Sequence, residues 1–323
     1  MDQATLGLLL YVLGLANLAA IYAVMALGLN LNWGVTGLFN AGVAGFFAVG
    51  AYTSVILTAP DSPHFLGGFD LPLPVGMVAA MLVSGLIALA IGAATIRLRS
   101  DYLAIGTIGI AEILRLVLKN EEWLTNGVRG ITTIPRPFVA ETALVSELSY
   151  LAMTLAILLV LYVLLEAALN SPWGRMMRAI RDSETTAAAA GKNVDARRLE
   201  AFVLGSMLMG LGGALFAHYL RYIGPEATEP VTTTFLVWVM LIAGGSGNNR
   251  GAILGAFVIW TIWSATELLT RQLPPEWAVR ASYLRIFLIG LLLQVVLQRY
   301  SRGLLPERNP AERGATGPQD RTL

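Results

Sequence analysis

The sequence predicts an all-α, polytopic transmembrane helical bundle of about eight to nine spans, some of them broken by glycine. Of its 323 residues, 56% are hydrophobic and only 13% are charged, whereas a soluble domain has about 25% charged residues. The mean hydropathy is +0.66. Long apolar runs recur along the chain without the alternation of a membrane β-barrel, so lipid is the expected solvent.

Nine segments are apolar and long enough to cross a bilayer as helices, which takes about 20 residues each. They are 6–28, 34–58, 74–96, 102–119, 149–169, 199–220, 232–247, 250–270 and 282–298. The seventh is the weakest, because its apolar part from Phe235 to Ala243 is followed by Gly244-Gly245-Ser246-Gly247. A broken crossing fits this run better than a phosphate loop, since no lysine follows it, and a re-entrant loop is the alternative.

The distribution of Lys and Arg predicts the orientation. Placing the loop 171–198 in the cytoplasm puts 14 of the 22 basic residues inside. These are Arg97, Arg99, Arg175, Arg178, Arg181, Lys192, Arg197, Arg198, Arg250, Arg299, Arg302, Arg308, Arg313 and Arg321. The N-terminus is then outside and the C-terminus cytoplasmic. If the seventh segment were re-entrant, the C-terminal tail would lie outside, which contradicts the excess of basic residues on the cytoplasmic side.

We expect one transmembrane domain over 1–301, with 171–198 as its cytoplasmic loop, and a disordered cytoplasmic tail over 302–323. The tail combines Pro306, Pro310 and Pro318 with many charges and cannot bury a core. No basic region precedes the first apolar run, so we expect that run to remain as a helix and not to be a cleaved signal.

Composition also limits the chemistry. The chain has no cysteine, which removes disulfides and thiolate ligands. His64 and His218 have no second ligand at metal-site spacing, so we expect no metal site and no cofactor, and each histidine to be exposed or hydrogen-bonded. A net charge of +1 without a single-sign run gives no indication of nucleic-acid binding.

Glycine clusters mark the expected helix contacts, because small residues let helices approach closely in lipid. Three helices carry them, at Gly42, Gly45 and Gly50, at Gly205, Gly210, Gly212 and Gly213, and at Gly247, Gly251 and Gly255.

The loop 171–198 is predicted to form a helix from Ser171 and Pro172 that continues to Ala190, stops at Gly191, and is followed by a second helix near Asp195. Arg178 with Asp182, and Arg181 with Glu184, have the spacing of surface ion pairs. The result is a helical knob that fits a groove on a partner protein. An amphipathic helix lying on lipid is the alternative, although the alanines 187–190 would bury little there.

The loop resembles the cytoplasmic loop of Liv-type permeases, the membrane subunits of hydrophobic amino-acid ABC importers. The similar residues are Arg178-Ala179-Ile180-Arg181-Asp182, Glu184, Ala187, Gly191, Asn193-Val194, Leu199 and Ala201-Phe202. Further similar blocks are Gly37-Leu38 to Tyr52, Asp101 to Arg115, Gly210 to Ala217, and Arg299 with Arg302-Gly303-Leu304, so the resemblance covers about 37–305 and is closer to LivM-like than to LivH-like subunits. The sequence departs from the family's pattern at Val43, Val128, Arg129 and Ala188.

The resemblance implies a permease subunit in a bacterial inner membrane. It would pair with a second permease, dock two cytoplasmic ATPases, receive branched-chain or related amino acids from a periplasmic binding protein, and alternate its access as ATP is hydrolysed. The ATPase-coupling residues would be Arg178, Arg181, Asp182, Glu184, Ala187 and Gly191. The chain has no Gly-x-x-x-x-Gly-Lys loop, so it would not hydrolyse ATP itself.

Polar residues within the spans are the candidates for the substrate pathway, because they are costly in lipid. These candidates are Thr36, Asn40, Thr107, Glu112 and Arg115. Glu112 and Arg115 are three residues apart and can alternatively form a structural ion pair.

Three other classes of membrane protein are alternatives to a permease subunit. An ion-coupled secondary transporter would use Glu112 but would not explain the knob. A membrane-embedded enzyme would need a cluster of polar catalytic groups at one depth, which the sequence does not offer. A scaffold subunit fits poorly with spans broken by glycine.

Overall fold

The computed structural model describes residues 2–98, 100–132, 134–140, 142–270, 278–299 and 303–307. Regular structure there is helical, with one isolated β-bridge between Ile131 and Ile223. The long helices are α1 (Gln3–Leu29), α2 (Val43–Thr58), α3 (Leu73–Thr95), α4 (Ser100–Asn120), α6 (Ala143–Asn170), α9 (Val194–Leu220), α10 (Pro230–Gly244), α11 (Asn249–Thr270) and α12 (Ala278–Arg299). The prediction of an all-α bundle is confirmed.

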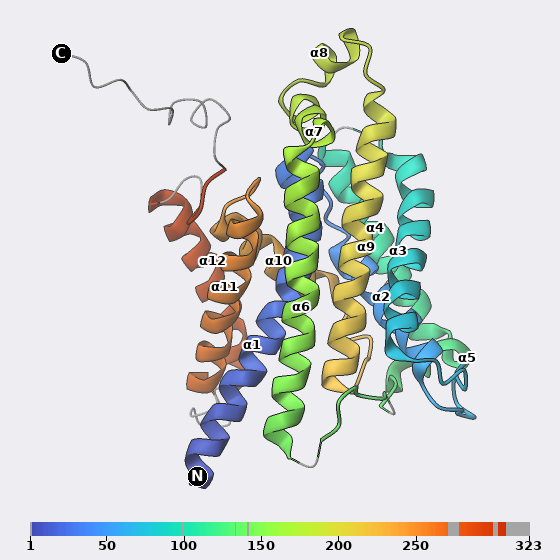
Figure 1. Cartoon of the computed structure of the whole chain (residues 1–323), viewed down its shortest axis with the longest axis vertical. Helices are drawn as coiled ribbons and strands as arrows, with labels where there is room; N and C mark the ends of the chain where they lie inside the picture. The colour runs from blue at the N-terminus through green and yellow to red at the C-terminus, as the bar shows by residue number, and fades with distance from the viewer. Residues whose placement is uncertain are drawn as a thin grey trace, which may run out of the picture.

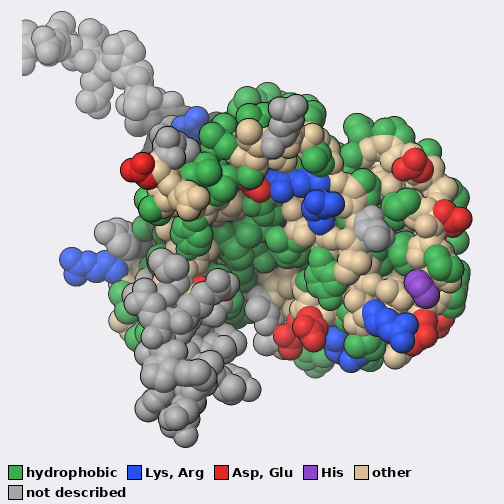
Figure 2. All heavy atoms as spheres, turned by 90° about the horizontal axis from the view of Figure 1, so that it is seen from below, with side chains coloured by type: hydrophobic (Ala, Val, Ile, Leu, Met, Phe, Trp, Pro, Cys, Tyr) green, Lys and Arg blue, Asp and Glu red, His purple; other side chains and the backbone are tan. Residues whose placement is uncertain are grey.

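The long helices run between two ends of the bundle (Figure 1). One end carries the N-terminus and the short helices α5 (Glu122–Thr125) and η2 (Gly127–Arg129). The opposite end, called the α7 end below, carries α7 (Pro172–Asp182) and α8 (Glu184–Ala189). Viewed from the N-terminal end, acidic and basic side chains lie scattered among apolar ones (Figure 2).

Four helical segments are long and apolar enough to cross a membrane: Gln3–Val35, α3, α6 and α9. α9 is the central one, since 72% of its apolar window is buried, against 17% for α6. α2 and Thr233–Gly244 are apolar but shorter. α4 has the length for a crossing but carries Asp101, Glu112, Arg115 and Lys119 and is not among the four.

The second predicted span, 34–58, is wrong as a single helix. α1 continues as a π-helix, η1 (Asn30–Val35), and residues 36–42 have no regular structure before α2 begins at Val43. Gly37 has a φ of +72° and ends the first helix, while the N–H groups of Gly37 and Leu38 donate to the carbonyls of Trp33 and Asn32. We call residues 36–42 the helix break.

The glycine run after α10 does end a helix, as predicted. α10 stops at Gly244, Gly245 and Gly247 have φ values of 117° and 82°, and α11 begins at Asn249. The turn leaves carbonyl groups of α10 without a helical partner.

Residues 303–307 satisfy these carbonyls, which places the first part of the predicted tail against the α10–α11 turn. The N–H groups of Leu304 and Leu305 donate to the carbonyls of Ala243 and Gly244, each at 2.9 Å. Asn248 Nδ2 in turn donates to the carbonyls of Leu305 and Pro306, each at 3.2 Å. The remainder of the predicted tail, 308–323, lies outside the described residues.

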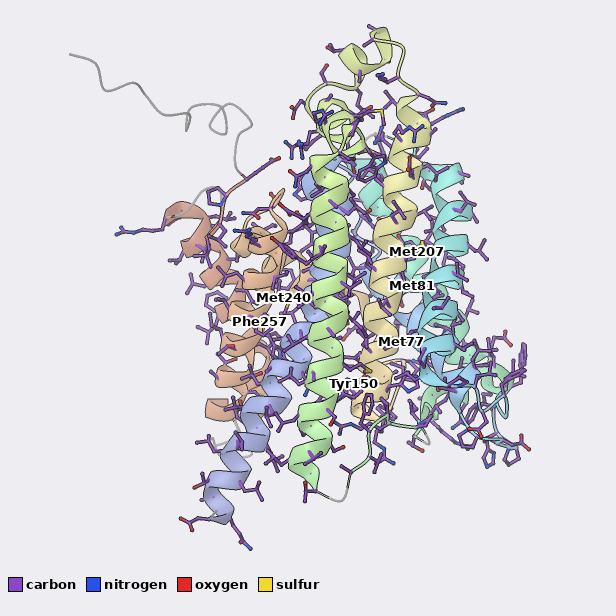
Figure 3. The ribbon with its side chains drawn as sticks, in the orientation of Figure 1. Met77, Met81, Tyr150, Met207, Met240 and Phe257 are labelled. Carbon is purple, nitrogen blue, oxygen red and sulfur yellow. The ribbon has the colours of Figure 1, made fainter. Side chains whose placement is uncertain are left out.

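Glycines set the closest helix contacts. A Cβ atom at Gly50 would overlap the backbone of Gly210, and one at Gly213 would overlap the backbone of Phe47. α2 therefore packs on α9 backbone to backbone. On the other side of α9, Met207 packs toward α3, where Met77 and Met81 lie (Figure 3).

Candidate functional site

The knob at the α7 end consists of α7, α8 and the turn that follows. Ser171 Oγ accepts from the N–H of Trp173 at 3.2 Å, which is the predicted helix cap. Met177 packs in a small apolar cluster with Leu31, Val35 and Leu169. One apolar face thus fixes α7 on the bundle.

The predicted continuous helix to Ala190 is wrong. α7 ends at Asp182, and Ser183 caps a new short helix by accepting from the N–H of Thr186 at 3.3 Å. Ser183 competes with the helix for backbone hydrogen bonds, which is why the chain breaks there. Gly191 does stop the segment, with a φ of +75°, and α9 begins at Val194.

The predicted coupling-loop residues divide into exposed and inward-facing ones. Asp182, Glu184 and Gly191 are exposed, whereas Ala187 is buried. Arg178 donates through Nη2 to the carbonyl of Leu169 at 3.2 Å. The exposed part of the knob is therefore its tip, which consists of Asp182, residues 184–186 and residues 188–193.

Both predicted ion pairs of the loop are replaced by others. Glu184 pairs with Arg198 at 3.0 Å across the knob, not with Arg181. Arg181 points inward: Nη1 donates to the carbonyl of Gly34 and pairs with Glu307 at 2.9 Å, while Nε faces Asp182 at 3.4 Å. Tertiary partners displace the local pairs because they offer a backbone carbonyl and a half-buried carboxylate.

Three of the predicted pathway residues lie at the helix break. Asn40 is fully buried, and its Oδ1 accepts from the N–H of Gly42 at 2.9 Å. Thr107 Oγ1 accepts from the N–H of Ala41 at 3.0 Å and donates to the carbonyl of Ala104. Thr36 Oγ1 donates to the carbonyl of Asn32. These side chains replace the helical hydrogen bonds that the break gives up.

An aromatic cluster at the break has no counterpart in the sequence-based prediction. Phe39 stacks on Trp238 with ring centroids 4.3 Å apart, and Trp33 meets them edge-on at 5.1 and 5.3 Å. Trp238 Nε1 donates to the carbonyl of Asn40 at 3.1 Å. Aromatic residues on both sides of Gly37 were the available signal, but nothing in the sequence pairs them with Trp238.

Glu112 and Arg115 form the ion pair that their spacing allows, through Nε and Nη2 of the guanidinium group. Their side chains are 40% and 20% exposed on α4. Glu112 lies eight residues, about 12 Å, from the end of that helix at Asn120. On the same helix, Glu112 and Arg115 follow Thr107, which contacts the helix break, by five and eight residues.

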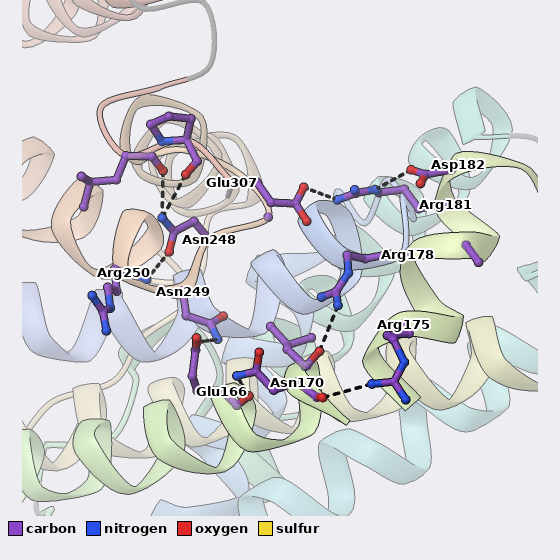
Figure 4. A pocket seen from close by; sticks show the side chains of 15 residues that line it. Glu166, Asn170, Arg175, Arg178, Arg181, Asp182, Asn248, Asn249, Arg250 and Glu307 are labelled. Atoms are coloured by element: carbon purple, nitrogen blue, oxygen red, sulfur yellow. Dashed lines mark hydrogen bonds and ion pairs between the residues drawn. The ribbon is translucent and has the colours of Figure 1, made fainter. Parts of the chain in front are cut away.

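A cavity of about 1030 Å³ opens at the α7 end between α6, α7, the α10–α11 turn and residues 305–307. Figure 4 shows its polar lining, in which Arg181 pairs with Asp182 and Glu307, while Arg175 and Arg178 donate to backbone carbonyls of α6. A second cavity, about 330 Å³ and apolar, lies near Met81 and Met207. The basic and acidic side chains that line the larger cavity nearly balance in number. They act mainly as contacts that hold α6, α7, the α10–α11 turn and residues 305–307 together.

His218 is buried and hydrogen-bonded: Nδ1 lies 2.8 Å from the carbonyl of Pro135, and Nε2 lies 3.0 Å from Ser54 Oγ. His64 is exposed. Within the described part of the chain, no group of three or more His, Cys, Asp or Glu residues could hold a metal ion.

The sequence matches the family model described as "Branched-chain amino acid transport system / permease component" over residues 11–297. It is 30% identical to the high-affinity branched-chain amino acid transport system permease protein LivM of Escherichia coli K12, over 92% of this chain and 70% of that protein. A probable branched-chain amino acid transport permease protein LivM of Methanocaldococcus jannaschii is 27% identical over 89% of this chain and 91% of that protein.

A more distant similarity is to the autoinducer 2 import system permease protein LsrC of Yersinia pseudotuberculosis, 28% identical over 70% of this chain and 59% of that protein. No solved structure matches the chain. The family match covers most of the chain and agrees with its long apolar helices. This multi-pass membrane protein therefore belongs to the family of branched-chain amino acid transport permease components.

Proposed function

We propose that this chain is the transmembrane permease subunit of an ATP-driven importer for branched-chain or related amino acids, in a bacterial inner membrane. It pairs with a second permease, binds two cytoplasmic ATPases at the α7 end and receives substrate from a periplasmic binding protein at the N-terminal end. The N-terminus is then outside and the C-terminus cytoplasmic. Similarity to LivM permeases supports the substrate class.

The exposed knob is the observation that carries ATPase coupling. Its tip projects from the bundle beyond α6 and α9 (Figure 1) and exposes Asp182, residues 184–186 and residues 188–193, while Met177 and Ile180 anchor it. A rigid helical projection fits a groove on a partner and can move the helices that it contacts. Since the chain has no phosphate-binding loop, ATP hydrolysis belongs to the partner subunits.

Purification of the tagged chain from native membranes in mild detergent tests this function. We expect two ATPases and a second permease to copurify. Asp182→Arg should reduce ATPase recovery by about tenfold while the second permease remains. The reason is that reversing a charge at a docking surface places it against the partner's complementary charge, which costs more than about 1 kcal/mol. Asp61→Arg, in an exposed segment at the opposite end, is the matched control. Recovery of the chain alone under conditions that preserve known complexes would reject the importer in favour of an ion-coupled secondary transporter.

Glu112 and Arg115 are proposed to line the substrate pathway, with Thr36, Asn40 and Thr107 supporting the helix break beside it. An amino acid carries one charge of each sign, and a half-exposed ion pair can exchange partners with it. Glu112→Gln should reduce ATP-driven leucine uptake by about tenfold at normal expression, because one charge-assisted contact is lost. Glu226→Gln, at an exposed position, should leave uptake unchanged. Full uptake by Glu112→Gln would remove Glu112 from the pathway.

A further inference from the structure

The π-helix η1 and the start of the helix break lie between the α10–α11 turn and α7. Asn30 Oδ1 accepts from the N–H of Gly247 at 2.8 Å, and Asn30 Nδ2 donates to Asn249 Oδ1 at 3.0 Å, which fixes the start of η1 on the α10–α11 turn. From the other side, Arg181 of α7 donates to the carbonyl of Gly34. A Cβ atom at Gly37 would lie 3.3 Å from Arg181 Cγ. Through Arg181, α7 thus contacts both Gly34 and Gly37, the two glycines between Trp33 and Phe39.

The π-helix η1, which leads into the break, carries an unsatisfied polar group. Asn32 is fully buried in η1, and neither Nδ2 nor Oδ1 has a hydrogen-bond partner among the described residues. Its amide lies against Gly205 of α9, where no Cβ atom could fit. Leaving such a group unpaired is costly, and π-helical turns of this kind are frequent at functional sites. A buried unpaired amide and a π-helical turn are both expected of an element that can adopt a second conformation.

The aromatic cluster places three apolar rings at the break. Trp33 and Phe39 are only partly buried, and together with Trp238 they join η1, the break and α10. Non-helical backbone at membrane depth is tolerated where it is buried in protein or lines a cavity. The stacked rings close such a space mainly by apolar contact, with one hydrogen bond added from Trp238 Nε1 to the carbonyl of Asn40.

We propose that Trp33, Phe39 and Trp238 form a gate at the α7 end of the pathway, for the apolar side chain of the transported amino acid. Arg181 is a positioning residue that ties this gate to the movement of α7. When a partner displaces α7, Arg181 pulls the Gly34–Gly37 backbone, and the rings on either side separate. This inference rests on the proposed function, since it requires an apolar amino acid and a partner that moves the knob.

The test uses the assembled complex, with both permeases and both ATPases, in liposomes preloaded with radiolabelled leucine. Without ATP, Phe39→Ala should release leucine about tenfold faster than the wild type, because the stacked contact with Trp238 is lost. Phe235→Ala removes a partly exposed ring from the same helix as Trp238 and should leave release unchanged. Equal retention by Phe39→Ala and the wild type would overturn the gate.

Arg181 is tested by the number of leucine molecules imported per ATP hydrolysed. Arg181→Ala should lower this ratio about tenfold with ATPase activity within about twofold of wild type, because the link from α7 to Gly34 is removed. Glu307→Gln weakens the ion pair and leaves the Gly34 contact in place, so it should keep the ratio. Equal losses in both variants would assign the effect to the C-terminal segment and overturn the role of Arg181.

If Arg181→Ala does not assemble, Arg181→Lys is used, because one ammonium group holds two separate acceptors less well than the guanidinium group. It should lower the ratio in the same direction, and an unchanged ratio would contradict the proposal. Absence of ATP-driven uptake in the wild-type complex would instead reject the proposed function. The two failures are therefore distinguishable.

Discussion

At the scale of single residues, Arg136 shows how much one side chain contributes to the N-terminal end of the bundle. Its guanidinium lies 5.2 Å from the ring centre of Tyr150 and 5.1 Å from that of Tyr219, and pairs with Glu147 at 2.9 Å. Glu147 Oε2 also accepts from Tyr219 and Asn17. These contacts join the connection before α6 to α1, α6 and α9.

Arg136→Ala is expected to destabilise the protein by about 2–4 kcal/mol, because it leaves the nearly buried carboxylate of Glu147 without its cation and removes two cation–π contacts. Thermal unfolding of the purified protein in detergent measures this as a lower Tm. Arg129→Ala, at an exposed position in the same connection, is the control and should not change Tm. Equal Tm values for both variants would contradict the structural role of Arg136.

At the scale of elements, α9 is the helix around which the others are arranged. Its glycines meet α2 and α1 backbone to backbone, and Gly210 also meets Ser84 of α3. Without a hydrophobic driving force between helices in lipid, such close packing is a main source of their association. The glycines are therefore a requirement of the helix contacts and not a sign of flexibility.

Gly213→Ala should destabilise the bundle by about 1–3 kcal/mol or prevent its assembly, because the added methyl group has no space beside Phe47. Gly109→Ala on α4 is the matched control, since nothing lies within 4 Å of a Cβ atom there. Thermal unfolding and the yield of monodisperse protein report the difference. If Gly213→Ala left the Tm and the yield of monodisperse protein unchanged, α2 and α9 would have to be farther apart than described.

At the scale of the whole molecule, two outer surfaces differ in polarity. The exposed side chains of α6 include Leu155, Leu159 and Val163 and are suited to lipid. α4 exposes Ile105 and Ile113 together with the Glu112–Arg115 pair. Charges facing lipid are costly, so α4 is expected to face the second permease, while α6 faces the bilayer.

This prediction can be checked by site-directed cross-linking, because the chain has no cysteine of its own. Ile105→Cys and Leu159→Cys are introduced singly and labelled with a photoreactive maleimide in the assembled complex. After irradiation, Ile105→Cys should join the second permease and Leu159→Cys should yield lipid adducts. The reverse pattern would place the subunit contact on α6.

By itself, the sequence determined the helical membrane fold, the glycine turn that ends α10, the cap at Ser171 and the stop at Gly191. Each of these follows from composition or from hydrogen bonds between near neighbours in the chain, which the order of residues specifies directly. The Glu112–Arg115 pair belongs to this group, because both residues lie on one helix.

The tertiary structure alone decided the features that join distant segments. It ended the first helix at Thr36 by placing η1 between α7 and the α10–α11 turn, and it turned Arg181 from the knob's surface toward Gly34 and Glu307. It also brought Trp238 to Phe39 and ordered residues 303–307. Partners in these contacts are 57 or more residues apart. Which side chain meets a buried carbonyl or ring therefore depends on how the helices pack, and no local pattern in the sequence could reveal it.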